Sequence, residues 1–147
     1  NELINVSVEK FDSLIHEKNI KLTCNMDDEA LIYSDEQRVR QMLSNVLSNA
    51  IKYGNGEIII SVFTDRDATR LSIEDNGPGI KDKEGVFDLY NQEDESLLER
   101  KGEGTGIGIY FIKLLCQDLK ISYKIEDRDV GSGTKFIFIF DDKSKKQ

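Results

Sequence analysis

The chain has 147 residues, which is enough for one domain with a hydrophobic core of ordinary size. Its 28 acidic and 20 basic residues give a net charge of −8, and the one dense basic tract lies at 143–146, so a nucleic-acid partner is not expected. The two cysteines form no CxxC pair, the single histidine stands alone and no apolar run reaches membrane-spanning length; this excludes a disulfide scaffold, a zinc site and a spanning segment, and favours a cytoplasmic setting.

Hydrophobic spacing and turn residues predict, in chain order, a helix at 8–18, a strand at 20–24, a helix at 35–52, strands at 57–64 and 69–74, a helix at 106–118, and strands at 121–126 and 134–140. Ser7 is placed to cap the first helix, and Ser34 with Gln37 resembles a capping box in front of the second. Because strands come in consecutive pairs and do not alternate with helices, the order favours an α+β fold. In this two-layer sandwich, helices cover one face of a mixed or antiparallel sheet.

The segment 81–103 differs in composition from the rest of the chain, since charged and small residues dominate it. It is too long for an ordinary connection in a compact domain, and segments of this length are usually lids or disordered. We therefore expect a lid at 81–103.

A polar stripe follows the second predicted helix. Asn45, Asn49 and Lys52 are spaced by four and three residues, so they lie on one side of the helix, next to its apolar face. An amide oxygen suits Mg²⁺, and a lysine one turn further along can contact a phosphate. Polar groups at this spacing are also common on solvated helix faces, so the stripe alone leaves both interpretations open.

Glycines gather in three clusters, at 75–80 (DNGPGI), 102–108 (GEGTGIG) and 131–134 (GSGT), and each cluster taken alone fits a turn. In the first, a carboxylate at a strand end could accept from an exocyclic amine while the glycines let a flat ring approach the backbone. The second leads into a helix, whose free N–H groups favour phosphate. It is not a Walker loop, because no Gly-Lys-Ser/Thr follows.

Taken in order, NVLSNAIKYG (45–54), DNGPGI (75–80), GTGIGI (104–109) and GSGT (131–134) resemble the N, G1, G2 and G3 boxes of the ATP-binding domain of sensor histidine kinases. The resemblance extends to about residue 140, so it covers almost the whole chain as a single domain, 1–147. It implies the Bergerat fold of the gyrase, Hsp90, histidine kinase and MutL superfamily: a mixed sheet of about five strands covered on one face by three helices, with an ATP lid. The implied cofactors are ATP and Mg²⁺.

The resemblance also assigns roles to individual residues. It implies that Asn49 is the Mg²⁺ ligand with Asn45 beside it, that Lys52 contacts phosphate and that Tyr53 is a wall of the nucleotide pocket. Asp75 would bind the adenine amino group, together with a water shared with Thr134. The other implied nucleotide-binding residues are Gly77, Gly79, Ile80, Tyr90, Gly104, Thr105, Gly106, Ile107 and Gly108.

Two departures from the family pattern bear on the chemistry. An arginine often follows the F box (here 86–90), but Asn91 and Gln92 stand there, so Arg100 or Lys101 is the candidate replacement from the far end of the lid. The ATP-hydrolysing members place a glutamate where this chain has Asn45, and an amide cannot act as a general base. Phosphoryl transfer to a protein, with Asn45, Asn49 and Lys52 as catalytic residues, is therefore favoured over hydrolysis.

The partner that the resemblance implies is a dimerisation domain, of the same or a paired kinase, which carries the phosphoacceptor histidine and serves a response regulator. His16 is followed by an acidic residue, as an acceptor would be, but it lies on the first helix of the ATP domain, so we interpret it as an ordinary surface histidine. We expect the isolated domain to be monomeric; whether a parent protein is anchored in a membrane stays open. The alternatives are an anti-sigma-factor-type serine kinase and a nucleotide-gated regulatory module without catalysis.

Overall fold

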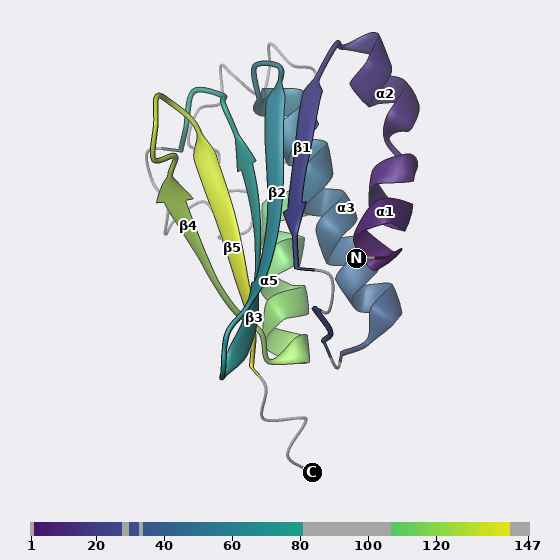
Figure 1. Ribbon diagram of the computed structural model, residues 1–147, viewed down its shortest axis with the longest axis vertical. Helices are drawn as coiled ribbons and strands as arrows, with labels where there is room; N and C mark the ends of the chain where they lie inside the picture. The colour runs from purple at the N-terminus through teal and green to yellow at the C-terminus, as the bar shows by residue number, and fades with distance from the viewer. Residues whose placement is uncertain (1, 28–29, 33, 81–106, 142–147) are drawn as a thin grey trace.

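The computed structural model describes residues 2–27, 30–32, 34–80 and 107–141, and it shows a five-stranded sheet with helices on one side (Figure 1). In chain order the elements are α1 (Glu2–Glu9), α2 (Asp12–Glu17), β1 (Lys21–Met26), α3 (Glu36–Tyr53), β2 (Glu57–Thr64), β3 (Ala68–Asp75), α5 (Ile107–Leu119), β4 (Ser122–Asp127) and β5 (Thr134–Asp141). The predicted α+β sandwich is therefore confirmed. The expected lid, 81–103, lies outside the described residues.

The sheet has the strand order β1-β2-β3-β5-β4, in which β1 runs parallel to β2 and every other neighbouring pair is antiparallel. Of the two alternatives left open by the sequence, the mixed sheet is the correct one. The β2–β3 hairpin closes through Asp65, whose Oδ1 accepts from the backbone N–H groups of Asp67 and Ala68 at 2.9 and 3.0 Å. The β3–β5 register then places Asp75 opposite Thr134, so two of the glycine clusters lie at one end of the sheet.

The core lies between the sheet and the helices α3 and α5, which also contact each other. The apolar face of α3 that the sequence predicted is buried, and so are the inward-facing residues of the central strands. The most fully buried are Val39, Met42, Leu43, Val46, Leu47, Ile58, Ile60, Ile73, Ile112, Cys116 and Phe138. Full burial of an aliphatic or aromatic side chain contributes roughly 1.5–3 kcal/mol, so this layer is the main source of the domain's stability. None of the described helices combines the length and apolar character needed to cross a bilayer.

Helix α3 begins at a different cap from the one predicted. Asp35 is the N-cap, and its Oδ1 accepts from the backbone N–H of Arg38 at 3.2 Å. Because this carboxylate occupies the capping position, the predicted capping box at Ser34 is wrong. At the other end the N–H of Gly54 donates to the carbonyl of Ala50 at 2.9 Å, which agrees with a helix ended by glycine.

The amino-terminal segment is also corrected, since the predicted helix at 8–18 is two short helices, α1 and α2. Ser7 does not cap a helix: it lies inside α1, where its buried hydroxyl donates to the carbonyl of Leu3 at 2.9 Å. The helical spacing misled because Val8, Phe11 and Ile15 all pack against the core although the helix is interrupted between them. The described residues therefore contain four helices where three were expected.

Candidate functional site

The second half of α3 carries the polar stripe that the sequence predicted. Asn45, Asn49 and Lys52 are half-buried, while Val46 and Ala50 beside them point into the core. The stripe therefore borders the core, and the fully solvated face that was the alternative interpretation is not what the structure has.

Asn49 holds an unpaired polar atom. Its Nδ2 is buried and, within the part of the chain that the structure describes, it is the only buried side-chain nitrogen or oxygen without a hydrogen-bond partner. A buried polar group left unpaired costs about 1–3 kcal/mol, so a partner from outside the chain would be stabilising here. An amide presents a carbonyl oxygen as well as a nitrogen, and this oxygen is a suitable ligand for Mg²⁺.

Few other ligands for a cation at Asn49 come from the described part of the chain. Within the described residues, no group of three or more His, Cys, Asp or Glu side chains is arranged to hold a metal ion. Mg²⁺ is commonly held by one or two protein oxygens, with phosphate and water completing an octahedron. The donor set at Asn49 therefore fits a Mg²⁺ ion that arrives with a phosphate ligand, and it does not fit an all-protein metal cage.

Asp75 ends β3 and is a buried carboxylate, 8% exposed. Its Oδ1 accepts from the backbone N–H of Gly77 at 2.8 Å. Burial raises the pKa of this carboxyl above its ordinary value, while the backbone N–H groups of Gly77 and Thr134 and the positive charge of Arg128 act in the opposite direction. A carboxylate held at a strand end and shielded from water can accept strongly from an exocyclic amine.

The carboxyl end of α3 and the end of β3 touch. A Cβ on Gly77 would clash with the backbone carbonyl of Tyr53, and one on Gly54 would lie 3.3 Å from the Cβ of Asp75. Gly77 is therefore required by the close approach of another backbone segment and not by a turn alone. The contact places Tyr53, which is half-buried, and the last turn of α3 beside Asp75.

The glycine cluster at 131–134 also contacts the end of β3. Gly133 has a φ of +149° and lies so close to Asp75 that a Cβ would clash with the Asp75 carbonyl, while its own oxygen is 3.6 Å from a Cβ placed on Gly79. The next residue, Thr134, is buried and pairs with Asp75 in the sheet. The clusters at 75–80 and 131–134 thus meet around one carboxylate, and half-buried Ile80 packs against the core beside them.

The sequence did not single out Asn76, whose side chain connects the end of β3 with the loop between α3 and β2. Its Oδ1 accepts from the backbone N–H groups of Asn55 and Glu57 at 2.9 and 3.0 Å, and its Nδ2 donates to the carbonyl of Asn55 at 3.2 Å. The Asn-Gly dipeptide predicts a turn, but the partners are about 20 residues away in the sequence, and no local pattern could have revealed them.

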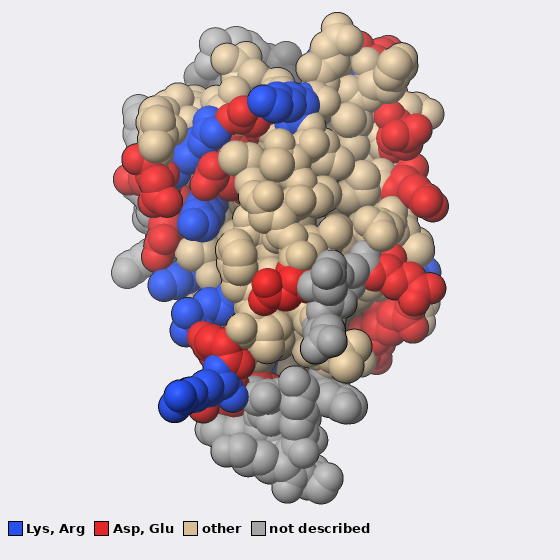
Figure 2. All heavy atoms as spheres, viewed as in Figure 1, with Lys and Arg blue, Asp and Glu red and all other residues tan. Residues whose placement is uncertain are grey.

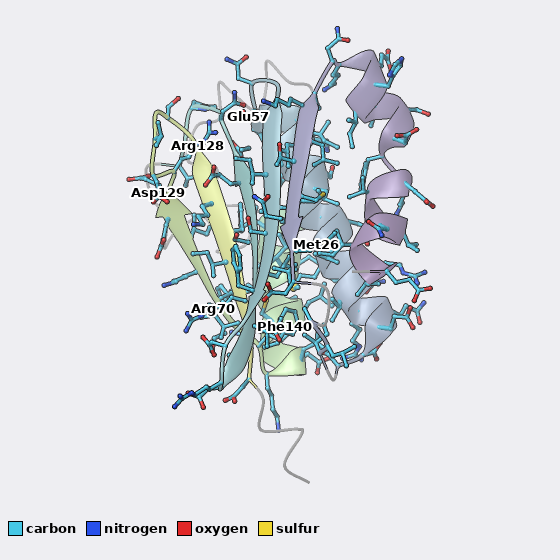
Figure 3. The ribbon with its side chains drawn as sticks, in the orientation of Figure 1. Met26, Glu57, Arg70, Arg128, Asp129 and Phe140 are labelled. Carbon is cyan, nitrogen blue, oxygen red and sulfur yellow. The ribbon has the colours of Figure 1, made fainter. Side chains whose placement is uncertain are left out.

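Arg128 is the second residue that the sequence did not single out. Its Nε donates to Oε2 of Glu74 at 3.0 Å, and its terminal guanidinium nitrogen pairs with Glu57. Figure 3 shows Arg128 and Glu57 at the same end of the sheet, close to the turn that follows β4.

The remaining predicted site residues belong to the second glycine cluster and the lid. Ile107 and Gly108 open α5, so a helix does begin at the predicted cluster. The others lie outside the described residues: Tyr90, Arg100, Lys101, Gly104, Thr105 and Gly106.

Comparison with known proteins agrees with this geometry. Residues 34–144 match the family described as histidine kinase-, DNA gyrase B-, and HSP90-like ATPase. The sensor protein RprX of Bacteroides fragilis is 33% identical over 145 residues, which cover 93% of this chain and 27% of RprX. The chain therefore spans about a quarter of that relative's length.

Solved structures carry the same arrangement of elements. The catalytic domain of the histidine kinase ThkA has a TM-score of 0.83 at 27% identity, covering all of this chain and 95% of that one. ThkA in complex with the response regulator protein TrrA has a TM-score of 0.78 at 26% identity and covers 100% of this chain and 41% of that one. The family match spans most of the chain, and the motif order, the mixed sheet and the buried carboxylate agree with it; the chain belongs to the histidine kinase-, DNA gyrase B-, and HSP90-like ATPase family.

Proposed function

We propose that this chain binds ATP together with Mg²⁺ and transfers the γ-phosphoryl group to a histidine on a separate dimerisation domain, as the catalytic part of a sensor histidine kinase. The observation that carries the proposal is a pair of buried polar groups on adjoining elements. Nδ2 of Asn49 on α3 is buried without a hydrogen-bond partner, and Asp75 at the end of β3 is a buried carboxylate that accepts from Gly77. Burial of an unpaired amide nitrogen and of a carboxylate carries a desolvation cost, which a ligand that hydrogen-bonds to both groups would offset.

In this proposal each end of the nucleotide meets different residues. Asp75 accepts a hydrogen bond from the adenine amino group, and Thr134, its neighbour in the sheet, shares a water with it. Asn49 supplies an oxygen to the cation, with Asn45 one turn before it on the same stripe, and Lys52 contributes positive charge toward the phosphates. Bound Mg²⁺ would neutralise charge on the phosphate oxygens. The protein's own contribution is then positioning and charge neutralisation, which is where most of the catalysis of phosphoryl transfer arises.

Asn45 favours transfer over hydrolysis. A neutral amide cannot remove a proton from water, so the stripe on α3 offers no general base for activating one. In the proposed reaction the nucleophile is instead an imidazole nitrogen of the acceptor domain. It forms a bond to the γ-phosphorus while the bond from that phosphorus to the β,γ-bridging oxygen breaks and ADP leaves. A response regulator is the expected recipient of the phosphoryl group downstream, and the solved complex of ThkA with a response regulator supports such a partner.

Titration calorimetry with ATP and Mg²⁺ tests the site assignment. Asn49→Asp places a negative charge beside the phosphates and Asp75→Asn turns an acceptor into a poorer one, so each is expected to abolish ATP binding or weaken it severely. Circular dichroism should show that both variants stay folded. Matched controls are Asn25→Asp and Asp67→Asn, which make the same chemical changes at exposed positions. Unchanged ATP affinity in both site variants would overturn the assignment.

A further inference from the structure

Arg128 follows β4 and forms a charged cluster with residues at the end of β3 and the start of β2, on the face of the sheet away from the helices. Its side chain is 16% exposed, and its two partners are Glu74 near the end of β3 and Glu57 at the start of β2, with side chains 15% and 30% exposed. Figure 2 shows that acidic and basic groups alternate along the β4 side of this face. Two half-buried carboxylates that face the same cation hold it in place, because a guanidinium can donate to both in a fixed geometry.

The same arginine contacts the turn at 131–133. Its backbone N–H donates to the carbonyl of Gly133 at 3.2 Å. A Cβ on Gly133 would lie 3.1 Å from Cδ of Arg128, so the aliphatic part of the arginine side chain lies against this glycine. Arg128 therefore holds the turn through its backbone and its side-chain stem, while its guanidinium is fixed to β2 and β3.

Gly133 in turn lies against Asp75. The backbone of Gly133 occupies the space next to the carbonyl of Asp75, and Thr134 after it pairs with Asp75. A continuous line of contacts thus runs from the two glutamates through Arg128 and Gly133 to the backbone of Asp75, the residue proposed to bind the adenine amino group. The charge of Arg128 also opposes the rise in the pKa of Asp75, whereas the charge of Glu74 adds to it.

We propose that Arg128 is a positioning residue for base recognition: anchored by Glu57 and Glu74, it holds the Gly131–Gly133 turn against Asp75 and so fixes the carboxylate and Thr134 in the geometry that accepts the adenine amino group. This inference rests on the proposed function. Arg128 is then expected to act on the base and not on the phosphates. Its contacts within the described residues are with Glu57, Glu74 and Gly133, at the start of β2, the end of β3 and just before β5.

The test compares two nucleotides, ATP and purine riboside triphosphate, which lacks the amino group that Asp75 would bind. Their dissociation constants are measured by calorimetry with Mg²⁺. The dissociation constant of the analogue divided by that of ATP gives the preference for ATP, and this ratio reports how well Asp75 is placed. Arg128→Gln is expected to reduce the preference for ATP about fivefold, in the range of coupling between contacting groups, while the affinity for the analogue stays close to that of the wild type. Arg128→Lys keeps the positive charge but lacks the planar guanidinium that donates to both glutamates, so it should retain more of the preference for ATP than Arg128→Gln does.

Two further variants keep the result interpretable. Glu57→Gln combined with Glu74→Gln releases the anchors but retains Arg128, and it should lower the same ratio even if Arg128→Gln proves too unstable to purify. Arg40→Gln removes an exposed arginine paired with Glu36 and should leave the ratio unchanged. An unchanged ratio in the Arg128 and glutamate variants, or an equal loss of affinity for both nucleotides, would overturn the inference alone. Failure of the wild type to bind ATP at all would overturn the proposed function and this inference with it.

Discussion

Asp75 shows how a single buried carboxylate can work against the stability of the free domain. The residue is 8% exposed, and burial raises its pKa, which means that the folded protein holds the proton more tightly than the unfolded chain does. Below the ordinary pKa of 3.8 the group is protonated in both states and has no ionisation cost. As the pH rises through the raised pKa, the folded state must ionise a buried group and loses stability relative to the unfolded chain.

Asp75→Asn should therefore change the pH dependence of stability. Asparagine cannot ionise, yet its side-chain oxygen can still accept from the N–H of Gly77. We expect the variant, without nucleotide, to be at least as stable as the wild type at pH 7, with a stability difference that grows as the pH rises above 3.8 and levels off above the raised pKa of Asp75. Urea unfolding of both proteins at several pH values measures this difference. A variant that loses stability relative to the wild type as the pH rises would contradict the account of Asp75.

Asn76 stabilises the contact next to Asp75, because its side chain holds the loop between α3 and β2 against the end of β3. Asn76→Ala removes three hydrogen bonds and leaves the N–H groups of Asn55 and Glu57 without this partner. We expect the free energy of unfolding to fall by about 1–3 kcal/mol and ATP affinity to fall with it. Asn76→Asp retains the accepting oxygen and should lose less. A loss of stability equal in the two variants would show that the accepting oxygen is not the important part of the contact.

At the scale of the secondary-structure element, the start of α3 gives a direct comparison of two adjacent residues. Asp35→Ala removes the side chain that accepts from Arg38 and should lower the free energy of unfolding by about 1 kcal/mol. Ser34→Ala removes only an exposed hydroxyl next to it and should have little effect. Thermal or urea unfolding of the two variants measures both effects. A larger loss of stability in Ser34→Ala than in Asp35→Ala would show that Ser34 is the N-cap, as the sequence predicted.

The elements also show what local sequence can and cannot predict. The buried face of α3 and the β2–β3 hairpin follow from repeats of apolar residues, and the structure has them where the sequence put them. The break between α1 and α2 was not predicted, because the helical spacing of apolar residues continues across it. The partners of Asn76 and Arg128 could not be predicted either, since Glu57 and Glu74 are 71 and 54 residues from Arg128 and only the strand order brings them together.

At the scale of the whole molecule, the mixed sheet is what assembles the site. Asp75 and Thr134 are brought together by the β3–β5 register, and α3 reaches the same end of the sheet because it packs along the core. The net charge of −8 gives ATP no general attraction, so in the proposed function its affinity would come from local groups such as Lys52 and from a cation bound with it. The sequence motifs predicted the family, and the structure brings the clusters at 75–80 and 131–134 together beside the last turn of α3.

Phosphoryl transfer to a histidine is tested by following the γ-phosphate of ATP. The domain is incubated with Mg²⁺ and ATP labelled at the γ-position, together with the purified histidine-bearing dimerisation domain of a compatible sensor kinase; Asp75→Asn serves as the inactive control. We expect label on the dimerisation domain that is stable in alkali and labile in acid, as phosphohistidine is, and none with Asp75→Asn. If ATP is instead bound and hydrolysed to free phosphate at the same rate with or without the acceptor domain, and no label reaches histidine, the proposed transfer is wrong.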